Sequence, residues 1–235
     1  MKAVVLLSGG VDSSTCLALA VKEYGCENIT ALNILYGQKH AKELESAKKI
    51  AEHYHVDYKL LDLSKIFSFS NCSLLTHSTE NIIHESYSEQ LEKMGGEGTV
   101  STYVPFRNGL MLSSVAAIAY SLIEGTDYEE ASIQIANHAD DSAGNAYADC
   151  SFDFINAMNS AISIGTYKKV FVEAPFTKFN KADIVFTGLM MNVPYEMTRS
   201  CYKDTVESCG QCGTCIDRLK AFEANKAIDP IIYKK

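Results

Sequence analysis

The sequence lacks the features that would tie a protein to a membrane. No apolar run approaches the roughly 20 residues that a membrane-spanning helix needs. Met1 and Lys2 lead directly into an apolar stretch, without the regions that make up a signal peptide. We therefore expect a cytoplasmic protein with no membrane partner.

An excess of positive charge is also missing. The chain has 21 Lys and Arg residues against 29 Asp and Glu, which gives a net charge of −8. Affinity for DNA or RNA comes mostly from neutralising phosphates. This composition therefore argues against a nucleic-acid partner, although a local basic patch can occur within an acidic total.

No internal repeat or low-complexity segment interrupts the 235 residues, and runs of apolar residues alternate with segments of helical periodicity. The predicted strands cover residues 2–7, 29–36, 58–63, 131–136 and 169–174. The predicted helices cover residues 15–24, 44–54, 108–123, 151–164, 181–189 and 217–226. This alternation predicts an α/β fold with a doubly wound, parallel five-stranded sheet.

The domain organisation that we expect is one α/β domain over residues 1–192 followed by a C-terminal segment over 193–235. Residues 64–102 are polar, and a loop of that length is typically a lid, a binding loop or a dimer contact. Helical turns are possible within it over residues 86–93.

The first loop, Ser8-Gly9-Gly10-Val11-Asp12-Ser13-Ser14, connects the first predicted strand to the first predicted helix. Its glycines permit a sharp turn, and its Asp and Ser side chains can accept hydrogen bonds from the open N–H groups of the helix. Such a loop suits a phosphate. It lacks the Lys-Ser/Thr ending of a Walker loop and the third glycine of the dinucleotide fingerprint. Two glycines alone would favour an ordinary strand-to-helix turn, but the whole hexapeptide at the end of the first strand favours nucleotide binding.

Four of the eight cysteines fall in one short stretch, here called the cysteine segment (residues 201–215): Cys201, Cys209, Cys212 and Cys215. Thiolates at this spacing can bind one metal ion in a tetrahedron with no open position, which is typical of structural zinc. An iron–sulfur cluster is the competing interpretation, because Cys-x2-Cys-x2-Cys also serves clusters. A third interpretation is that the four cysteines are buried in the core and bind no metal.

Several polar residues stand at strand ends or helix starts, where doubly wound sheets bind ligands. Asn108 is predicted to cap a buried helix, with Arg107 beside its open N–H groups. Asn180 is predicted to cap another helix, whose first residue, Lys181, needs an anion or solvent to compensate it. Asp149 precedes another predicted helix, and we expect it either to cap that helix or to bind a ligand. The loop 137–141 follows the fourth predicted strand.

Two levels of resemblance follow from these motifs. Ser8-Gly9-Gly10-Val11-Asp12-Ser13 resembles the loop of the N-type ATP pyrophosphatases, which cleave ATP between the α and β phosphates. With Tyr36-Gly37-Gln38-Lys39-His40, Val104-Pro105-Phe106-Arg107-Asn108, Tyr147-x-Asp149-Cys150, Lys181-Ala182-Asp183-Ile184-Val185 and Ser200-Cys201-Tyr202, and with the cysteine triplet, the chain resembles the 7-cyano-7-deazaguanine synthase family from end to end.

The resemblance implies an adenine nucleotide alpha hydrolase-like fold and an ATP-dependent carbon–nitrogen ligase of queuosine biosynthesis. Its expected partners are ATP with Mg²⁺, 7-carboxy-7-deazaguanine and ammonia, with structural zinc and a homodimeric assembly. The implied ATP-binding residues are Leu7, Ser8, Gly9, Gly10, Val11, Asp12, Ser13, Ser14, Thr15, Cys16 and Leu17. The implied catalytic residues are Asp12, Arg107 and Lys181. The implied substrate-binding residues are Lys39, His40, Arg107, Asn108, Asp149 and Arg199. The implied zinc ligands are Cys201, Cys209, Cys212 and Cys215.

The sequence departs from the family pattern near two motifs. Arg199 stands where members often have tryptophan, and Ala148 and Phe152 stand where prolines are common. If the segment around Arg199 lines the base pocket, an arginine there would alter which deazapurine or acyl intermediate fits, so ATP-dependent amidation that stops at the amide is one alternative. A tRNA-modifying pyrophosphatase and a nucleotide-binding module without catalysis are the others.

Overall fold

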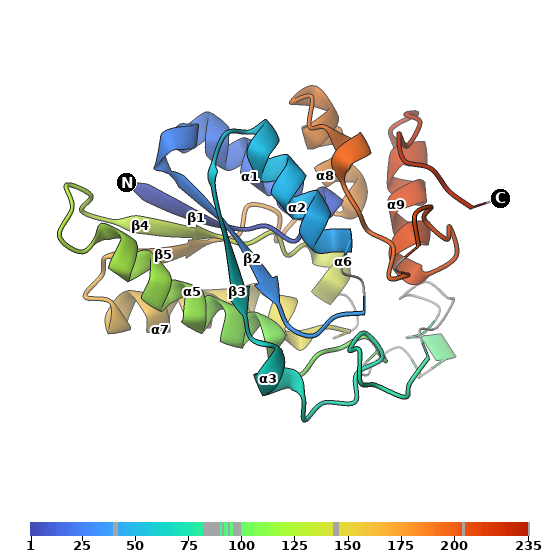
Figure 1. Cartoon of the computed structure of the whole chain (residues 1–235), viewed down its shortest axis with the longest axis horizontal. Coiled ribbons are helices and arrows are strands. Elements are labelled where there is room, and N and C mark those ends of the chain that lie inside the picture. Colours follow the sequence, from blue (N-terminus) through green and yellow to red (C-terminus); the bar gives the residue numbers. More distant parts are fainter. Residues whose placement is uncertain are drawn as a thin grey trace.

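The computed structural model describes residues 1–39, 42–81, 90, 92–93, 95, 100–142, 146–203 and 205–234. Its centre is a sheet of five parallel strands in the order β3-β2-β1-β4-β5 (Figure 1). The strands are β1 (Lys2–Leu6), β2 (Ile29–Leu35), β3 (Asp57–Asp62), β4 (Ala131–Gln134) and β5 (Val170–Glu173). The predicted doubly wound parallel sheet is therefore confirmed.

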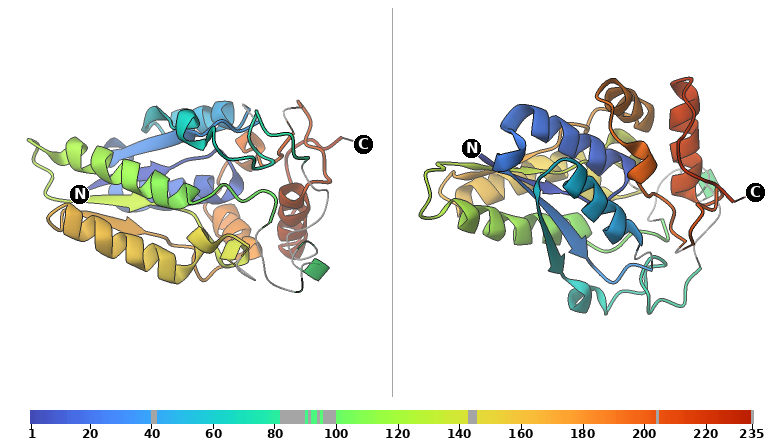
Figure 2. Two further views of the ribbon diagram at one scale, coloured as in Figure 1. Left: turned by 90° about the horizontal axis from the view of Figure 1, so that it is seen from below. Right: turned by 45° about the horizontal axis from the view of Figure 1, so that its top comes forward.

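Helices cover both faces of this sheet (Figures 1 and 2). On one face, α1 (Val11–Tyr24), α2 (Lys42–His53) and α8 (Lys181–Met190) enclose a core that includes Ala3 and Val5 of β1. On the other face, α5 (Arg107–Ile123) and α7 (Phe152–Gly165) enclose a core that includes Val4. Alternate residues of β1 thus pack into two cores, which explains why the strand is apolar throughout.

Short helices connect these elements: α3 (Ser64–Phe67), α6 (Ala139–Ser142) and the 3-10 helices Cys26–Asn28, Ala148–Cys150 and Tyr195–Met197. Part of the polar stretch at residues 64–102 packs on the domain. Leu75 forms an isolated antiparallel β-bridge with Gln38, and its side chain packs in a cluster with Tyr36 and Val104. The helical turns predicted at residues 86–93 lie mostly outside the described residues.

Three predicted helix starts can be compared with the structure. Helix α1 begins at Val11, because Gly10 is its N-cap and no side chain caps it, so the expected capping by Asp12, Ser13 and Ser14 is wrong. Asn108 does not cap α5 either, since Phe106 occupies that position with a φ of 52°. The predicted cap of α8 is confirmed: the Asn180 side chain accepts from the N–H of Asp183, and the Asp183 side chain accepts from Asn180 in return.

The last helix, α9 (Gly213–Ala224), joins the cysteine segment to the α/β core. Its Ala221 and Phe222 pack in the same core as α1 and α8, and the Phe222 ring lies edge-on to Tyr195. In Figure 1, α9 stands beside α8 at the end of the sheet to which the strands point. The cysteine segment is thus anchored next to the carboxyl ends of the strands.

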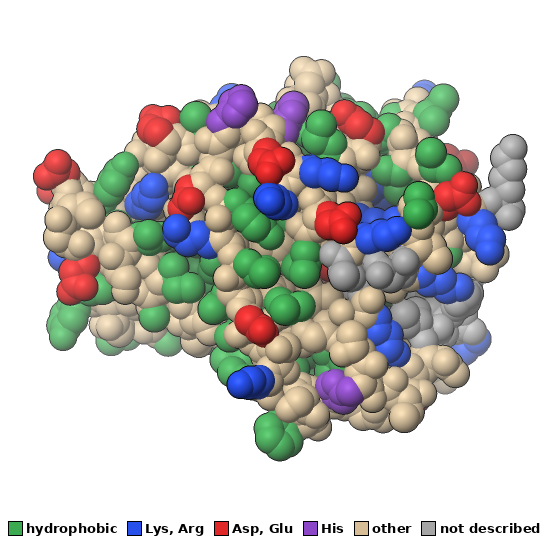
Figure 3. All heavy atoms as spheres, in the orientation of Figure 1, with side chains coloured by type: hydrophobic (Ala, Val, Ile, Leu, Met, Phe, Trp, Pro, Cys, Tyr) green, Lys and Arg blue, Asp and Glu red, His purple; other side chains and the backbone are tan. Residues whose placement is uncertain are grey.

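No helix in the described part of the chain combines the length and apolar character that crossing a membrane requires. Acidic and basic side chains are intermixed over α2 and β3 on the face shown in Figure 3.

Candidate active site at the carboxyl ends of β1 and β4

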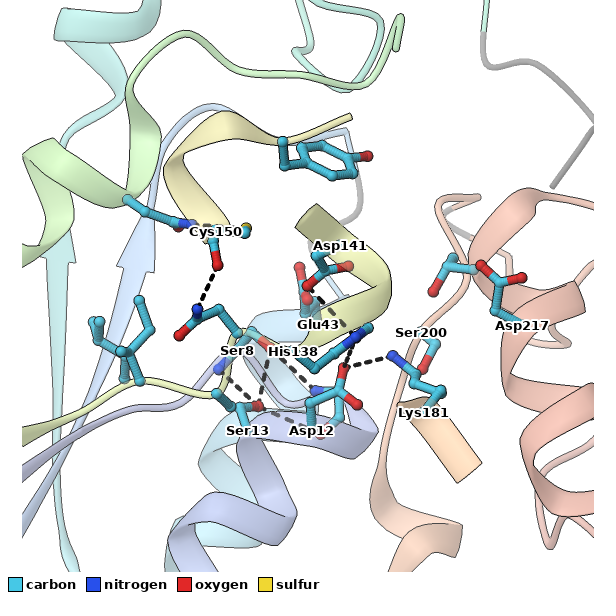
Figure 4. A pocket seen from close by; sticks show the side chains of 18 of the residues that line it. Ser8, Asp12, Ser13, Glu43, His138, Asp141, Cys150, Lys181, Ser200 and Asp217 are labelled. Carbon is cyan, nitrogen blue, oxygen red and sulfur yellow. Dashed lines mark hydrogen bonds and ion pairs between the residues drawn. The ribbon is translucent and has the colours of Figure 1, made fainter. Parts of the chain in front are cut away.

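A cavity of about 680 Å³ opens at the carboxyl ends of β1 and β4. These neighbouring strands lead into helices on opposite faces of the sheet, which is where doubly wound folds bind ligands. The first loop, the loop after β4 and the starts of α5, α8 and α9 all contribute to its wall. Figure 4 shows side chains of the first loop, of the loop after β4 and of α8 and α9 around one space, among them Ser8, His138, Lys181 and Asp217. The volume lies within the range of small-molecule sites.

The first loop packs tightly against α2 at Gly9. This residue has a φ of +90°, and a Cβ on it would lie 2.6 Å from the Glu43 carbonyl oxygen and 2.7 Å from the Ala47 nitrogen. Both the conformation and the close approach require glycine. The loop's path beneath the cavity is therefore fixed by backbone packing.

Hydroxyl groups fold the rest of the first loop onto the start of α1. The Ser8 and Ser13 hydroxyls share a hydrogen bond of 3.0 Å, and the Ser14 hydroxyl donates to the Gly10 carbonyl at 2.7 Å. Ser8, Gly10, Asp12 and Ser13 line the cavity. The positive end of the α1 dipole thus faces the cavity, an arrangement that favours a bound phosphate.

An ion pair links α1 to α8 beside the loop. The Lys181 Nζ donates to Asp12 Oδ2 at 2.5 Å, and both side chains are largely buried. Burial alone would raise the pKa of Asp12, but Lys181 and then His138 outweigh it, so the pKa is lowered from its ordinary value. Burial alone would lower the pKa of Lys181, but Asp12 outweighs it, so that pKa is raised. The predicted catalytic residues Asp12 and Lys181 therefore meet as a charged pair.

His138, which follows β4, stands among three carboxylates. Its Nε2 lies 3.5 Å from Asp141 Oδ2 and 3.8 Å from Asp12 Oδ2. Its Nδ1 is buried and lies 4.0 Å from Asp140 Oδ2, which is too far for a hydrogen bond, and it has no hydrogen-bond partner among the described residues. Sequence reasoning did not select His138 or Asp141 as site residues, although their loop lies where a parallel sheet binds ligands.

The third predicted catalytic residue, Arg107, enters the cavity from the first turn of α5. Its guanidinium carbon lies 5.4 Å from the centre of the Tyr36 ring. Burial alone would lower the pKa of Arg107, but neighbouring groups, Tyr36 first among them, raise it, so the side chain stays charged. Arg107 thus places a fixed positive charge in the cavity from α5, the helix on the opposite face of the sheet from α1.

Asn108 and Asp149 bind each other, and only Asn108 belongs to the cavity wall. The Asn108 N–H donates to Asp149 Oδ2 at 2.8 Å, and its side-chain amide donates to the Asp149 carbonyl at 3.1 Å. Both residues are buried. Asp149 therefore satisfies an open N–H group in the first turn of α5, a role that sequence reasoning had reserved for Asn108.

The remaining predicted substrate residues occupy different places. The Lys39 ammonium donates to the Glu80 carbonyl at 3.2 Å and is not part of the cavity wall. His40 lies outside the described residues. Arg199 does line the cavity, but its guanidinium donates to the carbonyls of Lys203, Thr205 and Val206.

The four cysteines of the cysteine segment form one buried cluster. Their sulfur atoms all lie within 4.8 Å of one another, and Cys209 and Cys215 are separated by 4.0 Å. Tetrahedral zinc–thiolate bonds of about 2.3 Å place sulfurs roughly 3.8 Å apart. Backbone N–H groups also donate to Cys201 and Cys209 sulfurs at 3.3–3.4 Å. The cluster therefore fits a four-thiolate metal ion.

The family model described as "Queuosine biosynthesis protein QueC" matches residues 2–226. The chain belongs to this family. Its relatives include the 7-cyano-7-deazaguanine synthase of Thermoplasma volcanium, which is 42% identical over 100% of this chain and 91% of the relative. The synthase of Caldicellulosiruptor saccharolyticus is 39% identical over 100% of this chain and 96% of the relative. That of Methanospirillum hungatei is 39% identical over the whole of both.

Among solved structures, an NMN synthetase from Francisella tularensis is similar to this chain, with a TM-score of 0.50 and 13% identity. The match covers 97% of this chain and 78% of the other. At that identity the likeness concerns the fold alone.

The cavity also includes residues that no motif indicated. Glu43 on α2 and Asp217 on α9 reach the wall from elements that are remote from the first loop in sequence. Asn33, in the buried strand β2, reaches it as well. A polar residue within an apolar strand was the available signal for Asn33, whereas Glu43 and Asp217 stand in ordinary charged helices.

Proposed function

We propose that the chain is an ATP-dependent ligase of queuosine biosynthesis that converts 7-carboxy-7-deazaguanine and ammonia into 7-cyano-7-deazaguanine. The observation that carries this proposal is the convergence of a phosphate-binding type of loop, Arg107 and the Asp12–Lys181 pair on one cavity. The names of the family and of the full-length relatives support the choice of substrate and product.

The triphosphate of ATP is assigned to the first loop and the start of α1. Open N–H groups and the helix dipole favour negative charge there. Lys181, held by Asp12 at the same edge, adds a buried positive charge. Together these groups orient the α phosphorus and spread positive charge over the phosphates, which accounts for much of the catalysis in nucleotide-transfer reactions.

Mg²⁺ is assigned to the phosphates at Asp12. The Oδ1 atom of this carboxylate is buried and has no partner among the described residues, and carboxylate oxygens are the ligands that Mg²⁺ prefers. A magnesium ion bound there would neutralise phosphate charge. Asp12 would hold it while its other oxygen stays bonded to Lys181.

The base and its carboxylate are assigned to the part of the cavity between β2 and α5. Tyr36, Met111 and Tyr147 supply flat or apolar surface for a planar ring system. Asn33 supplies an amide group, and Asn108, whose Nδ2 already donates to Asp149 and Cys150, supplies its amide oxygen. Arg107 is positioned to bind the substrate carboxylate, because a guanidinium pairs well with it. The remaining predicted substrate residues, Lys39, His40, Asp149 and Arg199, stay predictions.

The reaction proceeds in two adenylation steps. A carboxylate oxygen of the substrate attacks the α phosphorus of ATP, pyrophosphate leaves, and ammonia then displaces AMP from the acyl carbon to give an amide. The amide oxygen attacks a second ATP and releases a second pyrophosphate. AMP and two nitrogen-bound protons then leave to form the nitrile. No protein nucleophile is required, so the chain's groups orient the reactants and stabilise charge.

Zinc is assigned to Cys201, Cys209, Cys212 and Cys215 as one structural ion per chain. A closed four-thiolate site leaves no position for a substrate, so the ion would stabilise the cysteine segment. We further assign the chain to the cytoplasm, where thiols stay reduced, and to a homodimer, which light scattering after size-exclusion chromatography would test.

The decisive experiment supplies 7-carboxy-7-deazaguanine, ATP, Mg²⁺ and ammonium, measures pyrophosphate release and identifies the base by mass spectrometry. We expect two AMP and two pyrophosphate per nitrile. Amide as the final product supports amidation alone. ADP as the nucleotide product, or ATP consumption without the acid, contradicts the scheme. Tight ATP binding without turnover indicates a nucleotide-binding module.

A further inference from the structure

Arg199 contacts both the first loop and the cysteine segment. Its backbone N–H donates to the Gly9 carbonyl at 2.8 Å. Its guanidinium donates from Nη1 to the Val206 carbonyl at 3.0 Å, and from Nη2 to the Lys203 and Thr205 carbonyls at 2.6 Å each. The residue is 8% exposed. One buried residue therefore joins the two parts of the molecule to which the nucleotide and the metal ion are assigned.

The three carbonyls belong to the stretch of chain between Cys201 and Cys209. This stretch folds around the cluster, because the N–H groups of Lys203 and Cys209 both donate to the Cys201 sulfur, at 3.4 and 3.3 Å. A buried guanidinium needs acceptors in a fixed planar arrangement. The carbonyls that Arg199 contacts and the N–H groups that contact the Cys201 sulfur belong to the same stretch, so the Arg199 side chain is linked to the fold of the cysteine segment.

The other end of the contact is equally constrained. Gly9 is held against α2 with a positive φ, and a Cβ on Gly10 would lie 3.5 Å from the Arg199 carbonyl oxygen. The first loop therefore has the backbone of Arg199 on one side and α2 on the other. A displacement of Arg199 would change the direction of the peptide groups that face the cavity.

A second arginine, Arg218 on α9, contacts the segment that contains Arg199, residues 195–200. Arg218, fully buried, donates to the Thr198 hydroxyl at 2.7 Å and to the Tyr195 carbonyl at 3.2 Å, and it pairs with Asp229 at 2.7 Å. Residues 195–200 are thus fixed from both directions. Within this segment, the backbone N–H of Arg199 also donates to Gly9 of the first loop.

From these contacts we infer that Arg199 is a positioning residue that couples metal binding at the four cysteines to nucleotide binding at the first loop. The inference goes beyond the proposed reaction but rests on its nucleotide site. Coupling of this kind is reciprocal: the nucleotide raises the affinity for the metal by the same factor as the metal raises the affinity for the nucleotide.

The test measures both affinities in the purified full chain. Zinc affinity is determined by competition with a chromophoric chelator, with and without a non-hydrolysable ATP analogue and Mg²⁺. Analogue affinity is determined by calorimetry for zinc-loaded and zinc-depleted protein, and circular dichroism follows the fold of each. We expect the same factor in both directions, about fivefold or more.

Arg199→Ala keeps the backbone bond to Gly9 but removes all three guanidinium bonds, so we expect the factor to fall below about twofold while both ligands still bind. Arg199→Lys retains the charge and provides the same readout if the alanine variant does not fold. Lys203→Ala, which removes a positive charge from the same stretch but keeps its carbonyl, should retain the wild-type factor.

Three outcomes overturn the inference. A wild-type chain that binds both ligands independently shows no coupling. An Arg199→Ala variant with the full wild-type factor shows that the coupling bypasses this side chain, as it would if zinc loss simply unfolded the protein. A wild-type chain that binds no nucleotide refutes the proposed function as well, and the calorimetry separates this case from the first.

Discussion

The ammonium of Lys181 lies 2.5 Å from the Oδ2 of Asp12, although 169 positions separate the two residues in the sequence. Each stands in the first turn of its helix, α1 or α8, and these helices pack side by side over the same face of the sheet. The pair therefore fixes a positive charge beside the first loop and gives the site a measurable dependence on pH.

Lys181→Met should destabilise the folded chain by about 3 to 5 kcal/mol at pH 7, because it leaves the buried carboxylate of Asp12 without its cation. In the wild type the pKa of Asp12 is below 3.8, so its contribution to stability is complete above that pH and is lost as the pH falls through the folded pKa. The pKa of Lys181 is above 10.5, so its contribution is lost only as the pH rises through that higher value.

Urea unfolding at several pH values, without nucleotide or added Mg²⁺, measures this effect. The difference between wild type and Lys181→Met should shrink toward acid pH, where Asp12 becomes protonated in both proteins. Lys178→Met, which removes a lysine near the Phe152 ring, should change stability by no more than about 0.5 kcal/mol. A difference that stays constant with pH would mean that Lys181 stabilises the protein by packing alone.

The parts of the site that could be predicted from sequence are those that local chemistry determines. The apolar strand before Ser8 and the adjacent glycines predicted a loop at a ligand site, and this loop lines the cavity; the spacing of the cysteines predicted their cluster. Each of these signals lies within fifteen residues or fewer. The cap at Asn180 was predictable for the same reason. Contacts between residues that are distant in sequence could not be predicted in this way. Asp149 reaches the start of α5 from 41 positions away and takes the role expected of Asn108.

Backbone geometry explains the second difference between prediction and structure, which is the start of α1. The start of α1 was expected after the serines, since Ser and Asp favour the N-cap, but Gly10 occupies it and the serine hydroxyls turn back to the Gly10 carbonyl. This leaves the open N–H groups of α1 without side-chain caps. A helix start that is left open by its own side chains is suited to a phosphate ligand.

Gly9→Ala should abolish nucleotide binding. The new Cβ would meet two backbone atoms of α2 at 2.6 and 2.7 Å, and the positive φ adds strain, so the first loop must move. Calorimetry with an ATP analogue measures the loss. Gly125→Ala is the matched control, because Gly125 also has a positive φ, +72°, but nothing lies within 4 Å of its Cβ position. It should cost about 1 kcal/mol of stability and leave nucleotide affinity unchanged. Equal affinities for both variants would remove the first loop from the nucleotide site.

Cys212→Ser should remove the metal from the cysteine segment, because serine is a poor zinc ligand and three thiolates leave the tetrahedron incomplete. Elemental analysis of the wild type should give one zinc per chain. An iron content with visible absorbance would indicate a cluster instead. Cys26→Ser is the control, since Cys26 lies outside the cluster, after α1. That variant should keep the full metal content, and a loss of metal from it would contradict the assignment of ligands.

Arg107→Lys should lower kcat/KM for the carboxylic acid by about tenfold, or about 1.4 kcal/mol of transition-state stabilisation. The lysine keeps the charge but loses the planar fork that binds a carboxylate and the contact with the Tyr36 ring at 5.4 Å. Steady-state kinetics with the acid varied and ATP saturating measures the effect, and analogue affinity should stay within about twofold of the wild type. Tyr36→Phe keeps the ring beneath Arg107 and separates stacking from the phenol hydroxyl; we expect it to retain most of the activity. If Arg107→Lys instead weakened nucleotide binding and left the KM for the acid unchanged, Arg107 would belong to the phosphate side of the cavity, and the carboxylate would need a different partner.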